Sequence, residues 1–328
     1  MWPPSALTGI TVVEVAAYIP GPLCTQILAD MGANVIKIER PGGDPMRTLI
    51  PCAPNGENPF FSQINRNKQH IELDLKQPED VTRLRAIART ADVVVDGFRP
   101  GVLERLGVGA AALQLLNPRL VYLGLSGYGD NSPMRDVGGH DLNYVALSGF
   151  LGHTLVGDTP PMPGTHIADM ISGLAAATAV LGALQARERT GVGSLLDFAM
   201  SDAAYWLMLP GRALVAAGMP TPHPATYTGA LACYNIYPTF DGRHLVVGAL
   251  EPHFWQRFCE AIEHPELIAI QYDPSAQQHI HTCVAECIVT QPLAYWINIF
   301  SRVDACVTPA LTLEEAAALP LHRARMKG

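Results

Sequence analysis

Residues that could move a proton stand at two places in the chain. His140 follows two glycines in residues 135–149, "RDVGGHDLNYVALSG", and Asp141 comes directly after it. Asp169 stands where an apolar helical run, "MISGLAAA", begins. Imidazole titrates near neutral pH and a carboxylate can accept a proton, so His140 and Asp169 are residue types suited to general acid–base catalysis.

Each of these residues also has a purely structural explanation. Asp169 could be the N-cap of its helix, and Asp141 could cap the helix "LNYVALSG" that follows it. His140 could be an ordinary loop histidine, and Glu251, which precedes Pro252, could mark a helix start. Residue type and spacing alone leave both explanations open.

Arginines that follow hydrophobic runs indicate a second kind of chemistry. Arg40 follows "VIKIE" and Arg99 follows "VVVDGF". If both runs are parallel strands, their carboxyl ends meet at one edge of a sheet, and the two arginines predict an anion site there. The alternative is two solvated surface arginines. No GxGxxG follows the first strand and no GxxxxGK[ST] occurs, which argues against dinucleotide and P-loop sites.

The first 125 residues alternate β-branched runs with helical patterns. This rhythm predicts an α/β fold with a parallel sheet and helices on both faces, and ligands at the carboxyl ends of the strands. Strands are expected at 11–16, 34–40, 70–75, 92–98 and 119–127, and helices at 21–33, 78–91 and just before Leu106.

The pattern changes after about residue 195. A long helical region is expected over 194–218, followed by a Pro/Gly-rich stretch and then a hairpin that turns at Asp241-Gly242. The predicted organisation is a large α/β domain at 1–195, a helical and Pro/Gly linker at 196–229, a smaller α+β domain at 230–304 and a shortened C-terminal return segment at 305–328.

Composition narrows the possible partners. With 48% hydrophobic residues and a net charge of −8 over 328 residues, the chain is typical of a globular protein, and neither nucleic acid nor a membrane is expected as its partner. The apolar stretch from Met170 is short for a membrane span and predicts an interior helix.

Seven cysteines without CxxC spacing and the absence of a recognisable leader predict a cytoplasmic protein with reduced thiols. The "HIH" at 279–281 lacks partners at ligand spacing, so no metal is expected.

Five segments carry a more specific pattern: "PGPLCTQILADMGANVIKIERPGGDPMR", "NRNKQHIELDLK", "DGFRPGVLERLG", "NPRLVYLGLSGYG" and "RERTGVGSLLDFAMSDA". Together they resemble the type III CoA-transferase superfamily, also called the CaiB/BaiF family, over nearly the whole chain. The resemblance implies the CoA-transferase family III fold, in which a large domain with a parallel Rossmann-like sheet flanked by helices is joined to a smaller α+β domain.

Three further segments, "GGHDLNYVALSG", "IADMISG" and "VVGALEPHFW", resemble the α-methylacyl-CoA racemase branch. This implies an isomerase that moves the α-proton of a 2-methylacyl-CoA through an enolate. His140 and Asp169 would be the two bases, Glu251 a partner that fixes the tautomer of His140, and Asp141 a further member of the site. The alternatives are a CoA-transferase with Asp169 as nucleophile and a CoA-binding homologue without turnover.

The resemblance also implies how CoA is held and how the chain assembles. Arg40, Arg66, Lys68, Arg99 and Arg105 are the candidates for phosphate and adenine contacts, because arginine pairs with phosphate and stacks on bases. No cofactor is expected beyond the CoA moiety of the substrate, and an interlocked homodimer is expected. The chain departs from the pattern in the loop 49–69, which is closer to the transferases, and in its short final segment.

Overall fold

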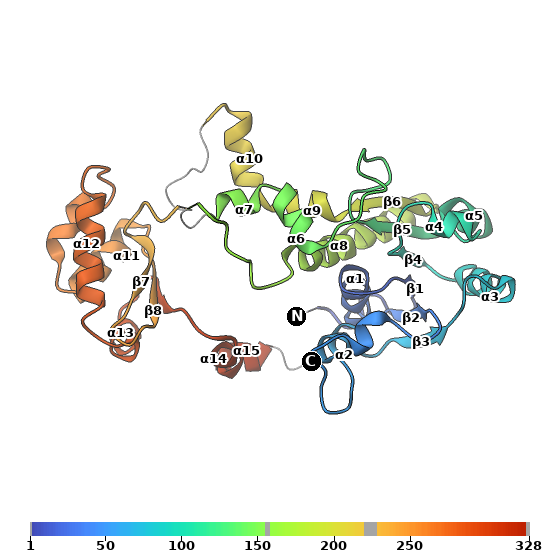
Figure 1. The fold of residues 1–328 in the computed structure, drawn as a ribbon, viewed down its shortest axis with the longest axis horizontal. Helices are drawn as coiled ribbons and strands as arrows, with labels where there is room; N and C mark the ends of the chain where they lie inside the picture. Colours follow the sequence, from blue (N-terminus) through green and yellow to red (C-terminus); the bar gives the residue numbers. More distant parts are fainter. Residues whose placement is uncertain (1, 155–157, 220–227, 326–328) are drawn as a thin grey trace. The chain divides into compact units, whose positions relative to one another are not determined.

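The computed structural model describes residues 2–154, 158–219 and 228–325, which form two compact units (Figure 1). The large unit comprises Trp2–Leu209 and the small unit follows from Pro210. The boundary falls at the start of helix α10 (Leu209–Ala216), inside the stretch expected to be a linker. Residues 220–227 of that expected linker lie outside the described residues.

A six-stranded parallel sheet forms the centre of the large unit, as predicted. Its strand order is β3-β2-β1-β4-β5-β6, so the order reverses between β1 and β4, where open α/β sheets bind ligands. Val13 of β1 pairs with Ile36 of β2 on one side and with Val94 of β4 on the other. The strands are β1 (Thr11–Val15), β2 (Asn34–Glu39), β3 (Gln69–Glu72), β4 (Val93–Asp96), β5 (Val121–Ser126) and β6 (Ser194–Ala199).

Helices cover both faces of the sheet because its central strands are apolar on both sides. Val12 and Val13, which point to opposite faces, are both fully buried. One face packs against α1 (Pro20–Asp30) and α8 (Ile167–Thr190). The other packs against α3 (Pro78–Ala88) and α5 (Ala110–Leu116). Helix α5 was not anticipated from the sequence.

Strand β6 corrects the expectation of one long helix over 194–218. Ser194–Ala199 pairs in parallel with β5 and extends the sheet of the large unit, and a helix starts only at α9 (Met200–Leu207). Strand β6 is an edge strand of the sheet, and Leu195 in it is 59% exposed whereas Ala199 is buried. Its leucines suit a helix as well as a strand, which is why the run alone was ambiguous.

Helix α8 contains the apolar stretch that was expected to be an interior helix. It is 24 residues long and is apolar enough to cross a membrane by length and composition alone. In this structure Ala176, Val180 and Leu184 are buried in the core with Leu28 of α1 and Leu123 of β5. The helix is therefore a core element, and small residues let α1 approach it closely.

The small unit has its own antiparallel sheet and core. Strands β7 (Tyr234–Pro238) and β8 (His244–Gly248) form the expected hairpin, whose turn includes Gly242 with a φ of 72°. Strand β9 (Val307–Pro309) pairs with the other edge of β8. The core helices are α11 (Pro252–Ala261), α12 (Gln277–Ile288) and α13 (Leu293–Phe300).

Shorter helices complete the two units. In the large unit these are α2 (Pro59–Ile64), α4 (Val102–Arg105), α6 (Asp141–Leu147), α7 (Phe150–His153) and a 3₁₀ turn at Pro45–Thr48. In the small unit they are α14 (Leu313–Ala318), α15 (Pro320–Arg325) and a 3₁₀ segment at Pro265–Ile270.

Candidate active site

A cavity of about 640 Å³ opens at the carboxyl ends of the first four strands. Arg40 and Arg105, both proposed from the sequence, line it together with Lys76. Lys76 follows β3 as Arg40 follows β2, so the rule that identified Arg40 also applies to Lys76, which the sequence analysis missed. Phe98 is 43% exposed in the same wall and offers an aromatic face among three cations. The lining is Val15, Ile38, Glu39, Arg40, Pro41, Leu73, Asp74, Leu75, Lys76, Phe98, Val102, Arg105 and Leu106.

Guanidinium groups lie between this cavity and the loop that carries His140. A Cβ atom at Gly101 would meet Arg105 Nη1 at 3.2 Å and Arg135 Nη2 at 3.4 Å. A Cβ atom at Gly138 would meet Arg99 Nη2 at 3.0 Å. The two glycines leave room for cationic side chains, so positive charge extends from the cavity towards His140. Arg135 was not anticipated from the sequence.

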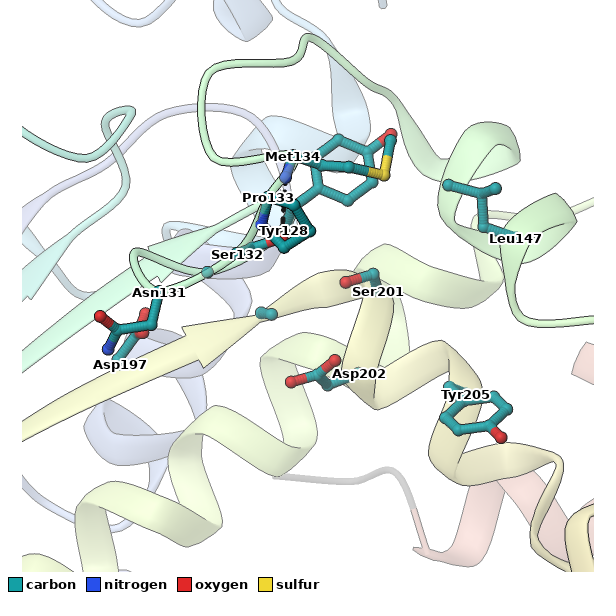
Figure 2. Close-up of a pocket in the computed structure, with 12 residues that line it drawn as sticks. Tyr128, Asn131, Ser132, Pro133, Met134, Leu147, Asp197, Ser201, Asp202 and Tyr205 are labelled. Atoms are coloured by element: carbon teal, nitrogen blue, oxygen red, sulfur yellow. Dashed lines mark hydrogen bonds between the residues drawn. The ribbon is translucent and has the colours of Figure 1, made fainter.

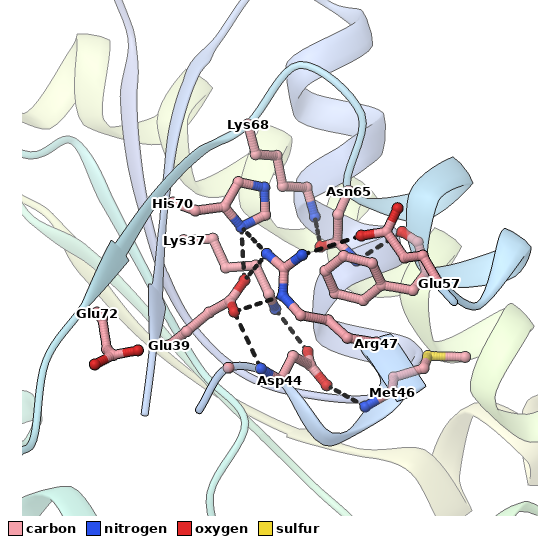
Figure 3. Close-up of polar contacts among 12 residues, drawn as sticks. Lys37, Glu39, Asp44, Met46, Arg47, Glu57, Asn65, Lys68, His70 and Glu72 are labelled. Atoms are coloured by element: carbon pink, nitrogen blue, oxygen red, sulfur yellow. Dashed lines mark hydrogen bonds and ion pairs between the residues drawn. The ribbon is translucent and has the colours of Figure 1, made fainter. Parts of the chain in front are cut away.

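Lys68 lies inside the fold and not at this cavity. Its side chain is fully buried, and its Nζ lies 2.9 Å from Glu14 Oε2 and donates to Asn65 Oδ1 at 3.0 Å. Burial opposes the ionisation of Glu14, but Lys68 and Lys37 lower its pKa to about 2. Figure 3 shows Lys68 beside Asn65 and Lys37 beside Asp44. An ammonium held in this way serves the fold, and the structure gives it no access to a phosphate.

Arg66 is also separate from the other proposed CoA contacts. It pairs with Asp30 at the end of α1 and donates to the carbonyl of Gln63 at 2.7 Å. Arg66 and Lys68 precede β3, so they start from the amino edge of the parallel sheet. Arg40, Arg99 and Arg105 follow strands and lie at the carboxyl edge. The structure thus divides the five predicted cations into two groups.

His140 is the N-cap residue of α6 and is exposed. Its backbone N–H donates to Asn143 Oδ1 at 3.0 Å. Gly139 before it is required by packing, because a Cβ there would meet the Tyr128 hydroxyl at 2.8 Å and Tyr144 Cε1 at 2.8 Å. The absence of a side chain at Gly139 therefore makes room for two tyrosines, which fix the backbone from which His140 projects.

Asp141 and Asp169 join the starts of α6 and α8. Asp141 Oδ1 accepts a hydrogen bond from the backbone N–H of Asp169 at 2.9 Å. Asp141 therefore caps α8, not the helix α6 in which it stands. The N-cap residue of α8 is His166, so the interpretation of Asp169 as an N-cap is wrong. The side chain of Asp169 is 15% exposed and is not the cap of α8.

The electrostatic surroundings of Asp169 are unusual for a carboxylate. Burial, with the neighbouring Asp141 carboxylate as the second cause, raises its pKa from 3.8 to about 6, while His166 and His140 act in the opposite direction. A carboxyl group with such a pKa changes its protonation state close to neutral pH, as an acid–base catalyst must.

His166 brings a third polar side chain to the same place. Polar atoms of Asp141, His166 and Asp169 all lie within 4.8 Å of one another. The "HIH" at 279–281 instead lies on α12, where His279 contacts Cys283 and His281 lies near Asn235.

Glu251 belongs to the small unit, where it is the N-cap residue of α11 and is exposed. Its backbone carbonyl accepts from the N–H groups of Phe254 and Trp255, both at 3.0 Å, so it does mark a helix start. The side chain makes no capping hydrogen bond. A hydrogen bond from Glu251 to His140 stays a prediction.

A second cavity, of about 670 Å³, lies at the carboxyl ends of β5 and β6 (Figure 2). Tyr128, which packs on Gly139, forms part of its wall, so this cavity begins beside the His140 loop. Met134 and Leu147 offer apolar surface, and Ser201 and Asp202 at the start of α9 offer polar groups.

The described geometry supports two chemical functions in the large unit. A cationic pocket at the carboxyl edge can bind a phosphorylated ligand with an aromatic base. A histidine and a carboxylate at adjacent helix starts can exchange protons with a bound molecule.

Comparison with known proteins places this arrangement in a family. The model of CoA-transferase family III matches residues 7–327, so the chain belongs to that family, as its motifs indicated. The α-methylacyl-CoA racemase of Homo sapiens is 35% identical over 319 residues, covering 94% of this chain and 79% of the relative. The acetyl-CoA:oxalate CoA-transferase of Acetobacter aceti is 32% identical, covering 98% and 85%.

Solved structures agree with the fold. The crystal structure of Rv3272 from M. tuberculosis matches with a TM-score of 0.84 at 29% identity, covering 99% of this chain and 89% of that one. A CAIB/BAIF family protein from Brucella suis matches with a TM-score of 0.83 at 27% identity, covering 97% and 87%. The predicted fold class is confirmed, and the relatives from Homo sapiens and Acetobacter aceti are named as a racemase and a CoA-transferase that work on CoA esters.

Proposed function

We propose that the protein is a racemase or epimerase of 2-methylacyl-CoA esters. The observation that carries this proposal is the convergence of His140, Asp141 and Asp169 at the adjacent starts of α6 and α8. Asp169 has a pKa raised to about 6, and His140 is close enough to influence its ionisation. Two acid–base groups of different type beside one bound α-carbon are what a two-base proton transfer requires.

CoA is anchored at the cationic cavity in this proposal. Arg40, Lys76 and Arg105 pair with its phosphates, and Phe98 stacks on the adenine. Arg99 lies between that cavity and Gly138, so the pantetheine arm passes Arg99 on its way to His140. These contacts hold substrate and transition state alike, and their task is to place the thioester.

The proton transfer then proceeds without any other reagent. The carboxylate of Asp169 takes the α-proton, the C–H electron pair moves into the enolate, and protonated His140 returns a proton to the opposite face. The reverse reaction starts from neutral His140 and protonated Asp169. Because the α-proton is far less acidic than either protonated base, the enolate oxygen must be stabilised as it forms.

The start of α8 is suited to that oxygen. The backbone N–H groups of Ile167 and Ala168 have no hydrogen-bond partner among the described residues. A helix N-terminus also contributes positive potential.

A CoA-transferase is the second candidate, favoured by the identity to the acetyl-CoA:oxalate CoA-transferase. Asp169 would then attack the thioester carbon, form an acyl-aspartyl anhydride and release the CoA thiolate. The thiolate would attack the aspartyl carbonyl, which expels the first acid as a carboxylate and leaves CoA as a thioester on Asp169. An acceptor carboxylate would take the CoA by the same two steps in reverse and free Asp169. His140 has no necessary part in those steps, because an ionised carboxylate is already a nucleophile.

Racemisation of enantiopure 2-methylacyl-CoA esters tests the proposal. A panel with short, branched and ring-bearing acyl groups is incubated with the protein, and the acids are resolved by chiral chromatography after hydrolysis. We expect at least one ester to lose its enantiomeric excess with the wild-type protein and to keep it with His140→Ala. Unchanged enantiomeric excess for every ester, with a protein that binds CoA, contradicts the proposal.

A further inference from the structure

His166 is a titratable residue of the site that the proton transfer above does not use. It stands three residues before Asp169 and is the N-cap residue of α8, yet its side chain makes no capping hydrogen bond. Its Nδ1 instead lies 3.8 Å from Asp169 Oδ2. The side chain of His166 is 60% exposed, while that of Asp169 is 15% exposed. The imidazole therefore connects a mostly buried carboxylate with solvent.

The groups that face Asp169 come from two helices. Helix α6 contributes the carboxylate of Asp141, the imidazole of His140 and the hydroxyl of Tyr144, and α8 contributes His166. Helices α1 and α9 also pack against α8. Among the described residues, neither contributes a charged group that acts on this carboxyl. The negative charge of Asp141 is thus opposed by two histidines.

The two histidines have different tasks. In the proposed reaction His140 must change its protonation state in each turnover, so its charge cannot be a constant support for Asp169. His166 is not needed for proton transfer to the substrate. More than half of its side chain is open to water.

We propose that His166 is a positioning residue whose imidazolium, at contact distance from Asp169, favours the ionised carboxylate that accepts the substrate α-proton. The inference rests on the proposed function. The imidazolium of His166 extends towards lower pH the range in which Asp169 acts as a base. His166 gives no proton to the substrate and leaves the reaction balanced as written above.

The test compares pH profiles of kcat/KM in the direction that uses Asp169 as base. In His166→Gln the acidic limb should move to higher pH, so that activity at pH 6, close to the pKa of Asp169, falls roughly twofold to fivefold, about the effect of a shift of half to one pKa unit. At pH 8 the change should stay below about twofold, because Asp169, with a pKa of about 6, is almost fully ionised there in both proteins. His166→Lys, which keeps a cation, should return the acidic limb of the kcat/KM profile to its wild-type position.

A matched control is Arg83→Gln on α3. Arg83 and Asp80 are also three residues apart in the sequence and form an ion pair, with 2.8 Å between Arg83 Nη1 and Asp80 Oδ1. Its pH profile should equal that of the wild type. A His166→Gln profile that also equals the wild type overturns the inference, as does a loss of activity that is the same at pH 6 and pH 8.

A second readout separates this inference from the proposed function. The titration of the Asp169 carboxyl can be followed by carbon-13 NMR in the folded protein, whether or not any ester is racemised. We expect His166→Gln to raise the pKa of Asp169 and His166→Lys to lower it again. If the wild type lacks racemase activity but this shift occurs, the proposed function fails and the electrostatic role of His166 stands. An unshifted carboxyl overturns that role.

Discussion

Asp141 and Asp169 are joined by a hydrogen bond of 2.9 Å, in which the backbone N–H of Asp169 donates to the carboxylate of Asp141. The bond fixes the start of α6 against the start of α8 and thereby brings the His140 loop to Asp169. It also places two carboxylates close together in a partly buried site. Burial and this like charge both disfavour the ionised form of Asp169.

Replacing Asp169 should therefore stabilise the protein while it abolishes activity. The pKa of Asp169 is raised from 3.8 to about 6, so ionisation in the folded state costs stability progressively as pH rises through that window. Above pH 6 the cost is complete and amounts to about 1–3 kcal/mol. Urea unfolding should show Asp169→Asn to be more stable than the wild type at pH 8 and equal to it at pH 3.5. Equal stability at both pH values would mean that Asp169 ionises without cost.

Asp141→Asn should change the pH dependence in the opposite direction to His166→Gln. The amide oxygen can still accept the hydrogen bond from Asp169, so α8 stays capped, but the like charge is gone. The pKa of Asp169 should fall, and the acidic limb of the kcat/KM profile should move to lower pH. Asp141→Ala, which also removes the hydrogen bond, serves as the comparison and should lose thermal stability. An acidic limb that moves upward in Asp141→Asn would contradict this account.

The fold was predictable where strands are β-branched and buried on both faces. The runs that became β1, β2 and β4 have no competing interpretation, since Val and Ile dominate them. Strand β6 was not predictable, because "SLLDFA" suits a helix equally well and only pairing with β5 makes it a strand. Tertiary context decided that segment.

The site was partly predictable for a similar reason. Arg40 and Arg105 could be placed at the cavity because chain position relative to a strand end locates a residue in a parallel sheet. The same rule applied to Arg66 and Lys68, which precede a strand, would have placed them at the other edge. The contact of His166 with Asp169 depends on how one side chain turns at the start of α8, and no pattern in the sequence encodes that.

The CoA site can be tested by charge removal at the cavity. Arg105→Gln and Lys76→Gln should each raise KM for acyl-CoA by roughly tenfold or more, because a charge-assisted hydrogen bond to phosphate is lost. The value of kcat should change little, since these contacts are alike in ground and transition states. Arg66→Gln is the matched control and should leave KM unchanged. Steady-state kinetics with one ester give all three values, and a rise in KM with Arg66→Gln alone would reverse the assignment.

Assembly as a homodimer stays a prediction. Aromatic and aliphatic side chains on α9 lie open in the single chain, with Trp206 64% exposed and Leu207 38% exposed. Apolar groups of this size are usually covered by another surface. Light scattering should give twice the chain mass at micromolar concentration, and Trp206→Glu should lower that mass and the activity together. A wild-type monomer with full activity would refute the prediction.

The most direct test of the central claim measures two products in one incubation. The protein is mixed in heavy water with a 2-methylacyl-CoA ester and a free carboxylic acid, and mass spectrometry follows both the ester and the acid. A two-base racemase predicts solvent deuterium at the α-carbon of an intact thioester, with loss of this uptake in Asp169→Asn. Movement of CoA to the free acid, without α-deuterium in the ester, would contradict the racemase account and leave Asp169 as the nucleophile of a CoA-transferase.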